Sequence, residues 1–191
     1  DKSIEPRDNL IRIYPQKNLF SHIIGQIDNE NNGISGLEKS LDEDLKNIKD
    51  PIRLTVDKNI QFLVREELIK FNEIFETKGS AAILINVNNG EILSLVSLPD
   101  FNPNKRQKIS DVNYINRATK GVYEFGSVFK TFTLAAALNE KIIEPETEFV
   151  QLPKSLSCAG FSIKEYDDEI PSNLTAEQIL IRSGNIGSVR I

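Results

Sequence analysis

The most informative stretch of the sequence runs Tyr123-Glu-Phe-Gly-Ser-Val-Phe-Lys-Thr-Phe-Thr-Leu-Ala-Ala-Ala-Leu138. It places Ser127 and Lys130 three residues apart at the head of an apolar helix, so both side chains should lie on one face. A serine hydroxyl is a weak nucleophile at neutral pH, and a lysine can serve as its base when burial lowers the lysine pKa. We therefore expect Ser127 and Lys130 to form a nucleophile–base pair on a helix that is buried nearly all round.

A second polar group lies downstream, at Ser183-Gly-Asn185. The preceding Thr175-Ala-Glu-Gln178 fits a capping box, which predicts a helix from Thr175 to Arg182 with Ser183 at or just past its end. A loop at that point can project Ser183 and Asn185 into a cleft opposite the first pair. Each short pattern alone is common on protein surfaces, but the two together are typical of a serine acyl-transfer site.

Local patterns also predict the elements between these motifs. They are a helix capped by Asp57 and ended by Gly79, strands at Ser80–Val87 and Glu91–Leu98 joined through Asn89-Gly90, and a strand at Phe161–Glu165. The first strand contains the continuously apolar run Ala81–Ile85, which is typical of a strand that is covered on both faces. We expect the helix that follows Ser127 to provide one of these covers.

The whole string from Asn116 to Leu138 closely resembles class B penicillin-binding proteins, the monofunctional peptidoglycan transpeptidases, and most of all their division-specific septal branch. The resemblance runs from about Arg12 to the last residue. Other strings that carry it are Arg12-Ile-Tyr-Pro15, Gly33-Ile-Ser-Gly-Leu-Glu-Lys-Ser40 and Leu54-Thr-Val-Asp-Lys-Asn-Ile-Gln61. It implies an α+β fold with two parts: a shortened, non-catalytic pedestal at residues 1–50, and at residues 51–191 the N-terminal half of a transpeptidase domain, with helices packed on an antiparallel sheet.

The same resemblance implies a mechanism. Ser127 would attack the penultimate D-alanine of a peptidoglycan stem peptide ending in D-Ala-D-Ala, with Lys130 as its base. Ser183 would relay a proton to the leaving amine, and Asn185 would bind the substrate amide and help to position Lys130. The acyl-enzyme would then pass to an amine of a neighbouring stem, and a β-lactam would acylate Ser127 in place of the stem peptide.

Partners and location follow from the resemblance as well. It implies a membrane-embedded glycosyltransferase and other division proteins as partners. It places the parent protein on the outer, periplasmic side of the cell membrane, anchored by an N-terminal helix. No run in this sequence approaches the roughly 20 apolar residues that span a bilayer, so we expect that anchor to lie outside it.

One family motif does not occur in the sequence. The third motif of these enzymes is Lys-Thr-Gly or Lys-Ser-Gly, and neither is found before the sequence stops at Ile191. In the family this motif lies on a strand beside the active site. We therefore expect the sequence to cover only part of the transpeptidase domain, and the chain by itself to be inactive or nearly so.

Composition excludes several other functions. Hydrophobic residues make up 39% and charged residues 27% of the chain, which is ordinary for a globular protein. The net charge of −5 argues against nucleic-acid binding. The one cysteine, Cys158, cannot form an internal disulfide, and no Cys/His cluster indicates a metal or another cofactor. The one histidine, His22, lies far from the motifs, which argues against a Ser-His-Asp triad.

Two alternatives stay open. A serine β-lactamase or a β-lactam sensor domain shares these motifs, although no Glu or Lys is clearly placed to activate a deacylating water and such a protein has no use for a pedestal. A non-catalytic module of the cell-wall machinery would instead bind partners through residues 1–50. Replacing Ser127 by Ala separates both enzymatic readings from the last one.

Overall fold

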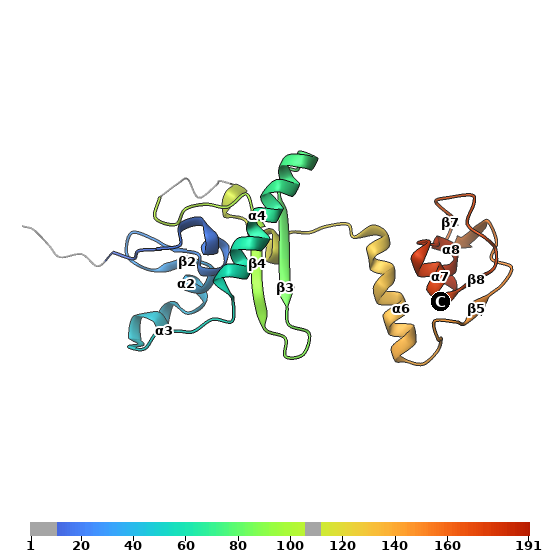
Figure 1. The fold of residues 1–191 in the computed structure, drawn as a ribbon, viewed down its shortest axis with the longest axis horizontal. Coiled ribbons are helices and arrows are strands. Elements are labelled where there is room, and N and C mark those ends of the chain that lie inside the picture. Colours follow the sequence, from blue (N-terminus) through green and yellow to red (C-terminus); the bar gives the residue numbers. More distant parts are fainter. Residues whose placement is uncertain (1–10, 106–111) are drawn as a thin grey trace, which may run out of the picture. The chain divides into compact units, whose positions relative to one another are not determined.

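The computed structural model describes residues 11–105 and 112–191. It divides into two compact units, Asp1–Val122 and Tyr123–Ile191, and each is described by itself. The boundary predicted near residue 50 lies inside the first unit, and the division into a pedestal and a transpeptidase part stays a prediction. Described helices and antiparallel strand pairs occur in both units, so the α+β expectation is confirmed (Figure 1).

Over residues 11–105 and 112–122, the first unit combines short helices, one long helix and two antiparallel hairpins. Its helical elements are η1 (Lys17–Phe20), α1 (Ser21–Ile24), α2 (Gly36–Ser40), α3 (Asp42–Asn47), α4 (Lys58–Phe75), η2 (Val112–Tyr114) and α5 (Arg117–Lys120), where η marks a 3-10 helix. Its strands are β1 (Gln26–Ile27), β2 (Gly33–Ser35), β3 (Ser80–Ile85) and β4 (Ile92–Leu98). Strand β1 pairs with β2, and β3 pairs with β4.

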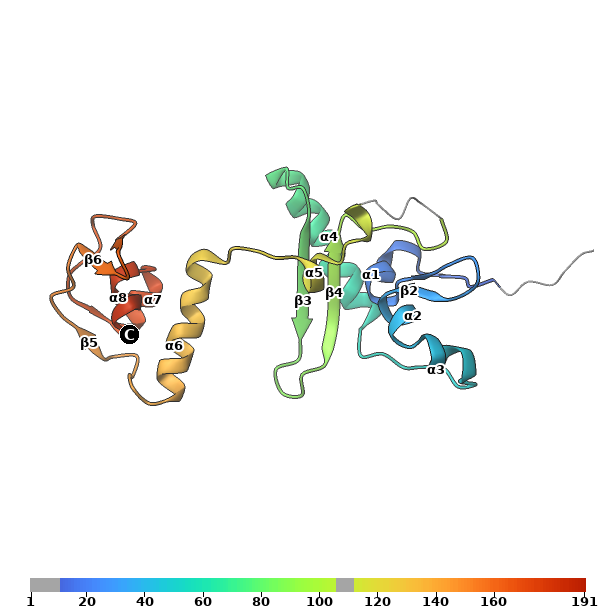
Figure 2. The same cartoon turned by 180° about the vertical axis from the view of Figure 1, so that it is seen from behind.

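The centre of this unit is the β3–β4 hairpin with α4 lying across it (Figures 1 and 2). Its register pairs Ser80 with Leu98 and Ile85 with Ile92, so the predicted hairpin is confirmed. Asp57 caps α4 as predicted, because its carboxylate accepts from two backbone N–H groups of the first turn. The predicted end at Gly79 is wrong: Glu76 already adopts the left-handed conformation that closes the helix.

Gln61 joins α4 to its surroundings. Its side chain is 1% exposed and makes four hydrogen bonds. Nε2 donates to the carbonyls of Leu19 in η1 and Leu95 in β4, at 2.9 and 2.8 Å. Oε1 accepts from Ser94 Oγ and from Leu95 N, at 2.8 and 2.9 Å. A fully satisfied amide at this depth holds the N-terminal segment, α4 and β4 in one arrangement.

The burial predicted for β3 is wrong within this unit. Ile83, Leu84 and Ile85 are 45%, 43% and 48% exposed, whereas β4 is buried from Ser94 to Leu98. Helix α4 packs mainly on β4, which leaves much of β3 without an apolar neighbour inside the unit. A continuous apolar run shows that a strand can be covered on both faces, but not which element covers it.

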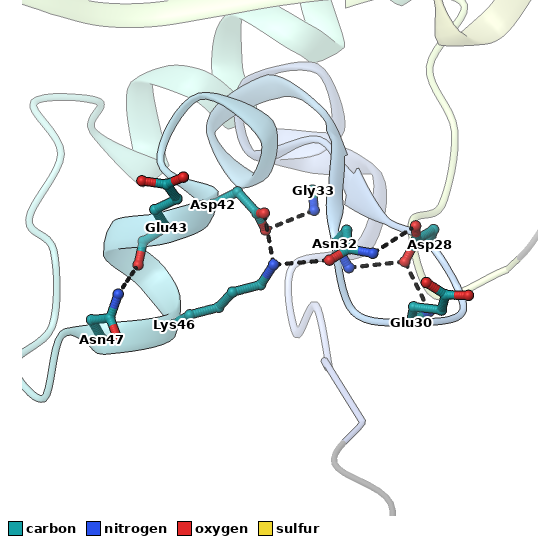
Figure 3. A network of polar contacts seen from close by, with 8 residues as sticks. All are labelled: Asp28, Glu30, Asn32, Gly33, Asp42, Glu43, Lys46 and Asn47. Atoms are coloured by element: carbon teal, nitrogen blue, oxygen red, sulfur yellow. Dashed lines mark hydrogen bonds and ion pairs between the residues drawn. The ribbon is translucent and has the colours of Figure 1, made fainter.

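The β1–β2 hairpin and α3 are tied together by a polar network on the surface (Figure 3). Lys46 Nζ donates to Asp42 Oδ2 at 2.8 Å and to Asn32 Oδ1 at 2.9 Å. Asp42 also accepts from Gly33 N, and Asp28 accepts from the backbone N–H groups of Glu30 and Asn32. Hydrogen bonds lower the pKa values of both Asp28 and Asp42.

The second unit contains the two sequence motifs. Its helical elements are η3 (Gly126–Phe129), α6 (Lys130–Asn139), α7 (Ala176–Ile181) and α8 (Asn185–Arg190). Its strands are β5 (Glu148–Phe149), β6 (Ser155–Cys158), β7 (Phe161–Lys164) and β8 (Leu174–Thr175), paired β5–β8 and β6–β7. Thr175 and Gln178 form the predicted capping box at the start of α7. The core of the unit comprises Leu152, Ile170, Leu174, Ile179 and Ile186.

The burial predicted for the Ser127 helix is also wrong within its unit. Only Leu134 and Ala137 of α6 are buried. Val128, Phe129 and Phe132 are 66%, 59% and 65% exposed, because α6 contacts α7 and α8 along one face and no other element of the unit covers the opposite face. None of the described helices combines the length and apolar character needed to cross a membrane.

Candidate active site

Ser127 lies in the 3-10 turn that leads into α6. Gly126 just before it has φ +53°, a left-handed conformation that glycine adopts at little cost, so the chain can turn sharply at the serine. Lys130 begins α6, and its backbone N–H donates to the Ser127 carbonyl, so the two residues are one helical turn apart as predicted. The Ser127 side chain is exposed, and no hydrogen bond joins its hydroxyl to the Lys130 amine.

The Lys130 amine is held by the second motif. Nζ donates to Asn185 Oδ1 at 2.6 Å, to the Ser183 carbonyl at 2.5 Å and to Ser183 Oγ at 3.2 Å. These three acceptors match the three donors of an ammonium group. The structure therefore brings together three of the four predicted site residues, although more than fifty positions separate Lys130 from the other two.

The environment of Lys130 lowers its pKa. Partial burial lowers the lysine pKa, because desolvation disfavours the charged amine, while the negative charge of Glu165 opposes the shift. The net direction is downward. A lysine whose pKa is lowered gives up its proton more readily, which is the property required of a general base at neutral pH.

Ser183 occupies a strained turn between α7 and α8. Its φ of +54° is unusual for a residue other than glycine and costs of order 1 kcal/mol or more. The turn is held by backbone bonds from Ser183 N to Leu180 O at 3.0 Å and from Gly184 N to Ile179 O at 2.9 Å. This conformation turns both the carbonyl and the hydroxyl of Ser183 toward Lys130. Strained residues of this kind cluster at functional sites.

Glu165 is a site residue that the sequence did not reveal. It follows β7, and its carboxylate accepts hydrogen bonds from Asn185 N at 2.5 Å and Ile186 N at 2.9 Å. The Asn185 side chain also donates to the Lys164 carbonyl at 2.8 Å. The strand predicted at residues 161–165 gave no signal for this role, because the contact joins residues that share no helical or strand spacing.

The other candidate reactive residues, Cys158 and His22, lie outside this site. Cys158 is an exposed thiol on β6. His22 belongs to the first unit, where its ring Nε2–H donates to the Asn113 carbonyl at 2.8 Å. Within residues 11–105 and 112–191 no three His, Cys, Asp or Glu side chains lie together in a way that could hold a metal ion.

Comparison with known proteins agrees with this geometry. Residues 80–191 match the penicillin-binding protein transpeptidase domain. The probable peptidoglycan D,D-transpeptidase FtsI of Caulobacter vibrioides is 35% identical over 142 residues, covering 72% of this chain and 24% of that protein. Stage V sporulation protein D of Bacillus subtilis is 32% identical over 168 residues, covering 73% of this chain and 26% of that protein. The chain thus spans about a quarter of the length of these two relatives.

A solved structure gives the same answer at the level of the fold. Penicillin-binding protein 3 of Mycobacterium tuberculosis, crystallised with ampicillin, is 25% identical with a TM-score of 0.79, covering 94% of this chain and 42% of that one. The family match covers more than half of this chain and includes both motifs. The chain therefore belongs to the penicillin-binding protein transpeptidase family.

Proposed function

We propose that this chain carries the acylation site of a peptidoglycan D,D-transpeptidase, with Ser127 as nucleophile and Lys130 as its base. Ser183 relays a proton, and Asn185 holds the substrate amide and the lysine. The observation that supports this assignment most strongly is the set of contacts from Lys130 Nζ to Ser183 and Asn185. The names of the curated relatives supply the reaction class.

In the proposed acylation step, Ser127 Oγ attacks the carbonyl carbon of the penultimate D-alanine. The hydroxyl proton passes to neutral Lys130, and terminal D-alanine leaves as an amine that takes up a proton through Ser183. An ester then joins the stem peptide to Ser127. An amine of a second stem attacks this ester, forms the cross-link and restores the serine, so two moderate barriers replace one high barrier.

The contacts around Lys130 suit both protonation states. The ammonium form fills three acceptors, one each on Asn185 Oδ1, Ser183 O and Ser183 Oγ. The neutral amine has two N–H donors and a lone pair, so it keeps two of these bonds and points the lone pair at a hydroxyl. The Ser183 hydroxyl can then donate where it previously accepted, which is the exchange that a proton relay needs.

A β-lactam fits the same chemistry. Attack by Ser127 opens the strained lactam amide, and the departing nitrogen stays tethered to the acyl group, so the ester persists. The Mycobacterium tuberculosis relative was crystallised with ampicillin. For this chain we propose β-lactams as ligands of Ser127, and a stem peptide ending in D-Ala-D-Ala as the substrate.

The proposed setting is septal cell-wall synthesis at the outer face of the cell membrane, with a membrane-embedded glycosyltransferase and division proteins as partners. Two of the curated relatives carry the name FtsI, one of them the Escherichia coli D,D-transpeptidase at 27% identity. A β-lactamase is the weaker alternative, because these relatives are named as transpeptidases. A septal role predicts that cells relying on Ser127→Ala form filaments, whereas an elongation role predicts rounded cells.

The chemistry is tested by labelling with a fluorescent penicillin in cells that express the protein from its own gene. The wild type should become labelled, and Ser127→Ala should not. Ser172→Ala is the matched control, because Ser172 is an exposed serine on the loop before β8 and should label normally. Equal labelling of Ser127→Ala and wild type would remove Ser127 from the mechanism. Slow loss of the label indicates a transpeptidase, and rapid turnover indicates a β-lactamase.

A further inference from the structure

Glu165 contacts the turn that carries the second motif, Ser183-Gly-Asn185. Its two carboxylate oxygens accept from two successive backbone N–H groups, Asn185 N and Ile186 N, at the start of α8. The side chain is half-buried, and its Oε1 would lie 3.8 Å from a Cβ at Gly184. Ionised acceptors form stronger hydrogen bonds than neutral ones, so this carboxylate is the firmest side-chain contact to the start of α8.

Asn185 links Lys130 to the residues at the end of β7. Asn185 has its backbone N–H on Glu165, its side-chain amide on the Lys164 carbonyl, and its side-chain oxygen on Lys130 Nζ. Each group of the asparagine therefore has one partner, and two of the three anchors come from the end of β7. A shift of the backbone at Asn185 would move Oδ1 away from the lysine.

We propose that Glu165 is a positioning residue for the active site: its carboxylate fixes the start of α8 and thereby holds Asn185 Oδ1 against Lys130. It does not touch the substrate or the nucleophile. The effect of this role on catalysis rests on the proposed function, whereas the hydrogen bonds from Asn185 N and Ile186 N to Glu165 do not. Sequence motifs of the chain do not include Glu165, so the assignment comes from the geometry alone.

The charge of Glu165 also acts on Lys130. Among the described groups, Glu165 is the one whose charge contributes to the lysine shift; the other groups facing the amine, from the α7–α8 turn and α8, are the neutral Ser183 and Asn185. Burial lowers the Lys130 pKa and the carboxylate raises it. Removing the negative charge should therefore lower the lysine pKa further, since the ammonium form loses a favourable interaction.

The test follows Lys130 and the start of α8 by NMR in the 191-residue chain, comparing wild type with Glu165→Gln, Glu165→Ala and Glu169→Gln. Gln is isosteric and keeps one acceptor oxygen, whereas Ala removes both. Glu169 is an exposed carboxylate four positions away, so its variant removes the same charge at a distance from the site. Titration of the Lys130 ε-methylene signal reports the pKa, and amide exchange at Asn185 and Ile186 reports the two hydrogen bonds.

In Glu165→Gln the Lys130 titration should move to lower pH, while Glu169→Gln should titrate like wild type. In Glu165→Ala the amides of Asn185 and Ile186 should exchange roughly tenfold faster or more, because each loses a charge-assisted hydrogen bond. An unchanged or upward shift in Glu165→Gln, or unchanged exchange in Glu165→Ala, overturns the proposal.

The Lys130 titration and the amide exchange do not depend on acylation, so they distinguish failure of the proposed function from failure of the positioning role. If Ser127→Ala labels like wild type while Lys130 responds as expected, the proposed function is wrong and the positioning contact stands. If Ser127 is acylated and Lys130 does not respond, Glu165 has no positioning role. In labelled cells, Glu165→Gln should also move the acidic limb of the acylation rate to lower pH, whereas Glu169→Gln should leave it in place.

Discussion

At the scale of single residues, serine at position 183 is unfavourable for stability but suited to the proposed proton relay. Its left-handed backbone, with φ +54°, suits glycine better than serine. Its carbonyl and hydroxyl both face Lys130, and the hydroxyl is the group that we assign to proton relay. A serine at this position therefore lowers stability while it places a hydroxyl against Lys130, and a trade of stability for function is common at active sites.

This conflict predicts opposite effects on stability and activity. Ser183→Gly should raise the free energy of unfolding relative to Ser183→Ala by about 1 kcal/mol, because glycine adopts the left-handed region without strain. Both variants lose the hydroxyl, so both should be acylated more slowly by penicillin than wild type. Denaturant unfolding and labelling rates check the two halves; a glycine variant that is labelled as fast as wild type would remove Ser183 from the relay.

His22 predicts a pH dependence of stability in the first unit. Burial lowers its pKa, and the ring donates to the Asn113 carbonyl while packing edge-on against Phe101. Because the unfolded chain then binds a proton more readily than the folded one, the contribution of His22 is complete above about pH 7 and is lost as pH falls through the depressed folded pKa.

The check is the free energy of unfolding at about pH 7.5 and about pH 5, measured by urea denaturation for wild type and His22→Gln. The amide can replace the donor to Asn113 but does not titrate. The loss of stability on acidification should therefore be smaller in His22→Gln. Equal losses in the two proteins would show that groups other than His22 account for the whole dependence.

At the scale of secondary-structure elements, the site depends on how α7 packs against α8. Gly187 of α8 lies against the side chain of Ile179, which is fully buried in α7. A Cβ at Gly187 would come within 2.6 to 2.8 Å of three carbons of Ile179. The two helices are therefore close because position 187 has no side chain, and this closeness sets where α8 begins.

Gly187→Ala should consequently disturb the site, although Gly187 is not one of the proposed catalytic residues. Overpacking against Ile179 should destabilise the second unit by about 1–3 kcal/mol and push α8 outward. The displacement would move Asn185 from Lys130 and slow acylation. The double variant Gly187→Ala/Ile179→Ala removes all three of these carbons, so it makes room for the new methyl and should recover part of the rate. If the single variant is acylated at the wild-type rate, α8 can shift without moving the catalytic groups.

Helix α4 depends in the same way on Gln61, which links it to Leu19, Ser94 and Leu95. Gln61→Ala would remove four hydrogen bonds, three of them to the buried residues Ser94 and Leu95, so it should lower the unfolding free energy by about 2–4 kcal/mol. Gln61→Glu has nearly the same shape, but its carboxylate can donate to neither carbonyl, so it should also destabilise. Thermal unfolding checks both variants, and a wild-type melting temperature in either would show that the network contributes little.

The elements predicted correctly have strong local signals. The Asp57 cap, the Asn89-Gly90 hairpin and the Thr175–Gln178 capping box are each defined within a few residues, and the structure contains all three. Apart from the end of α4, which was predicted at Gly79 and lies at Glu76, the wrong predictions concern burial, at β3 and around α6. Burial depends on which distant segments arrive to cover a face, and no local pattern carries that information. Glu165 was missed for the same reason.

At the scale of the whole molecule, each unit leaves apolar surface exposed. The exposed apolar side chains include Ile83 of β3 and Phe71 and Ile74 of α4 in the first unit, and Phe129 and Phe132 in the second. Exposed apolar faces of this kind are uncommon on monomers and usually serve as contact surfaces. The polar site formed by Lys130, Ser183 and Asn185 nevertheless lies wholly inside the second unit.

The central claim is that Ser127 is the nucleophile served by Lys130, and mass spectrometry of the penicillin-treated protein, isolated from cells that express its own gene, tests it most directly. A penicilloyl adduct is expected on the peptide containing Ser127, with fragment ions assigning it to that residue, and a strongly reduced adduct is expected in Lys130→Ala. An unmodified Ser127 peptide, or an adduct on another serine, would contradict it.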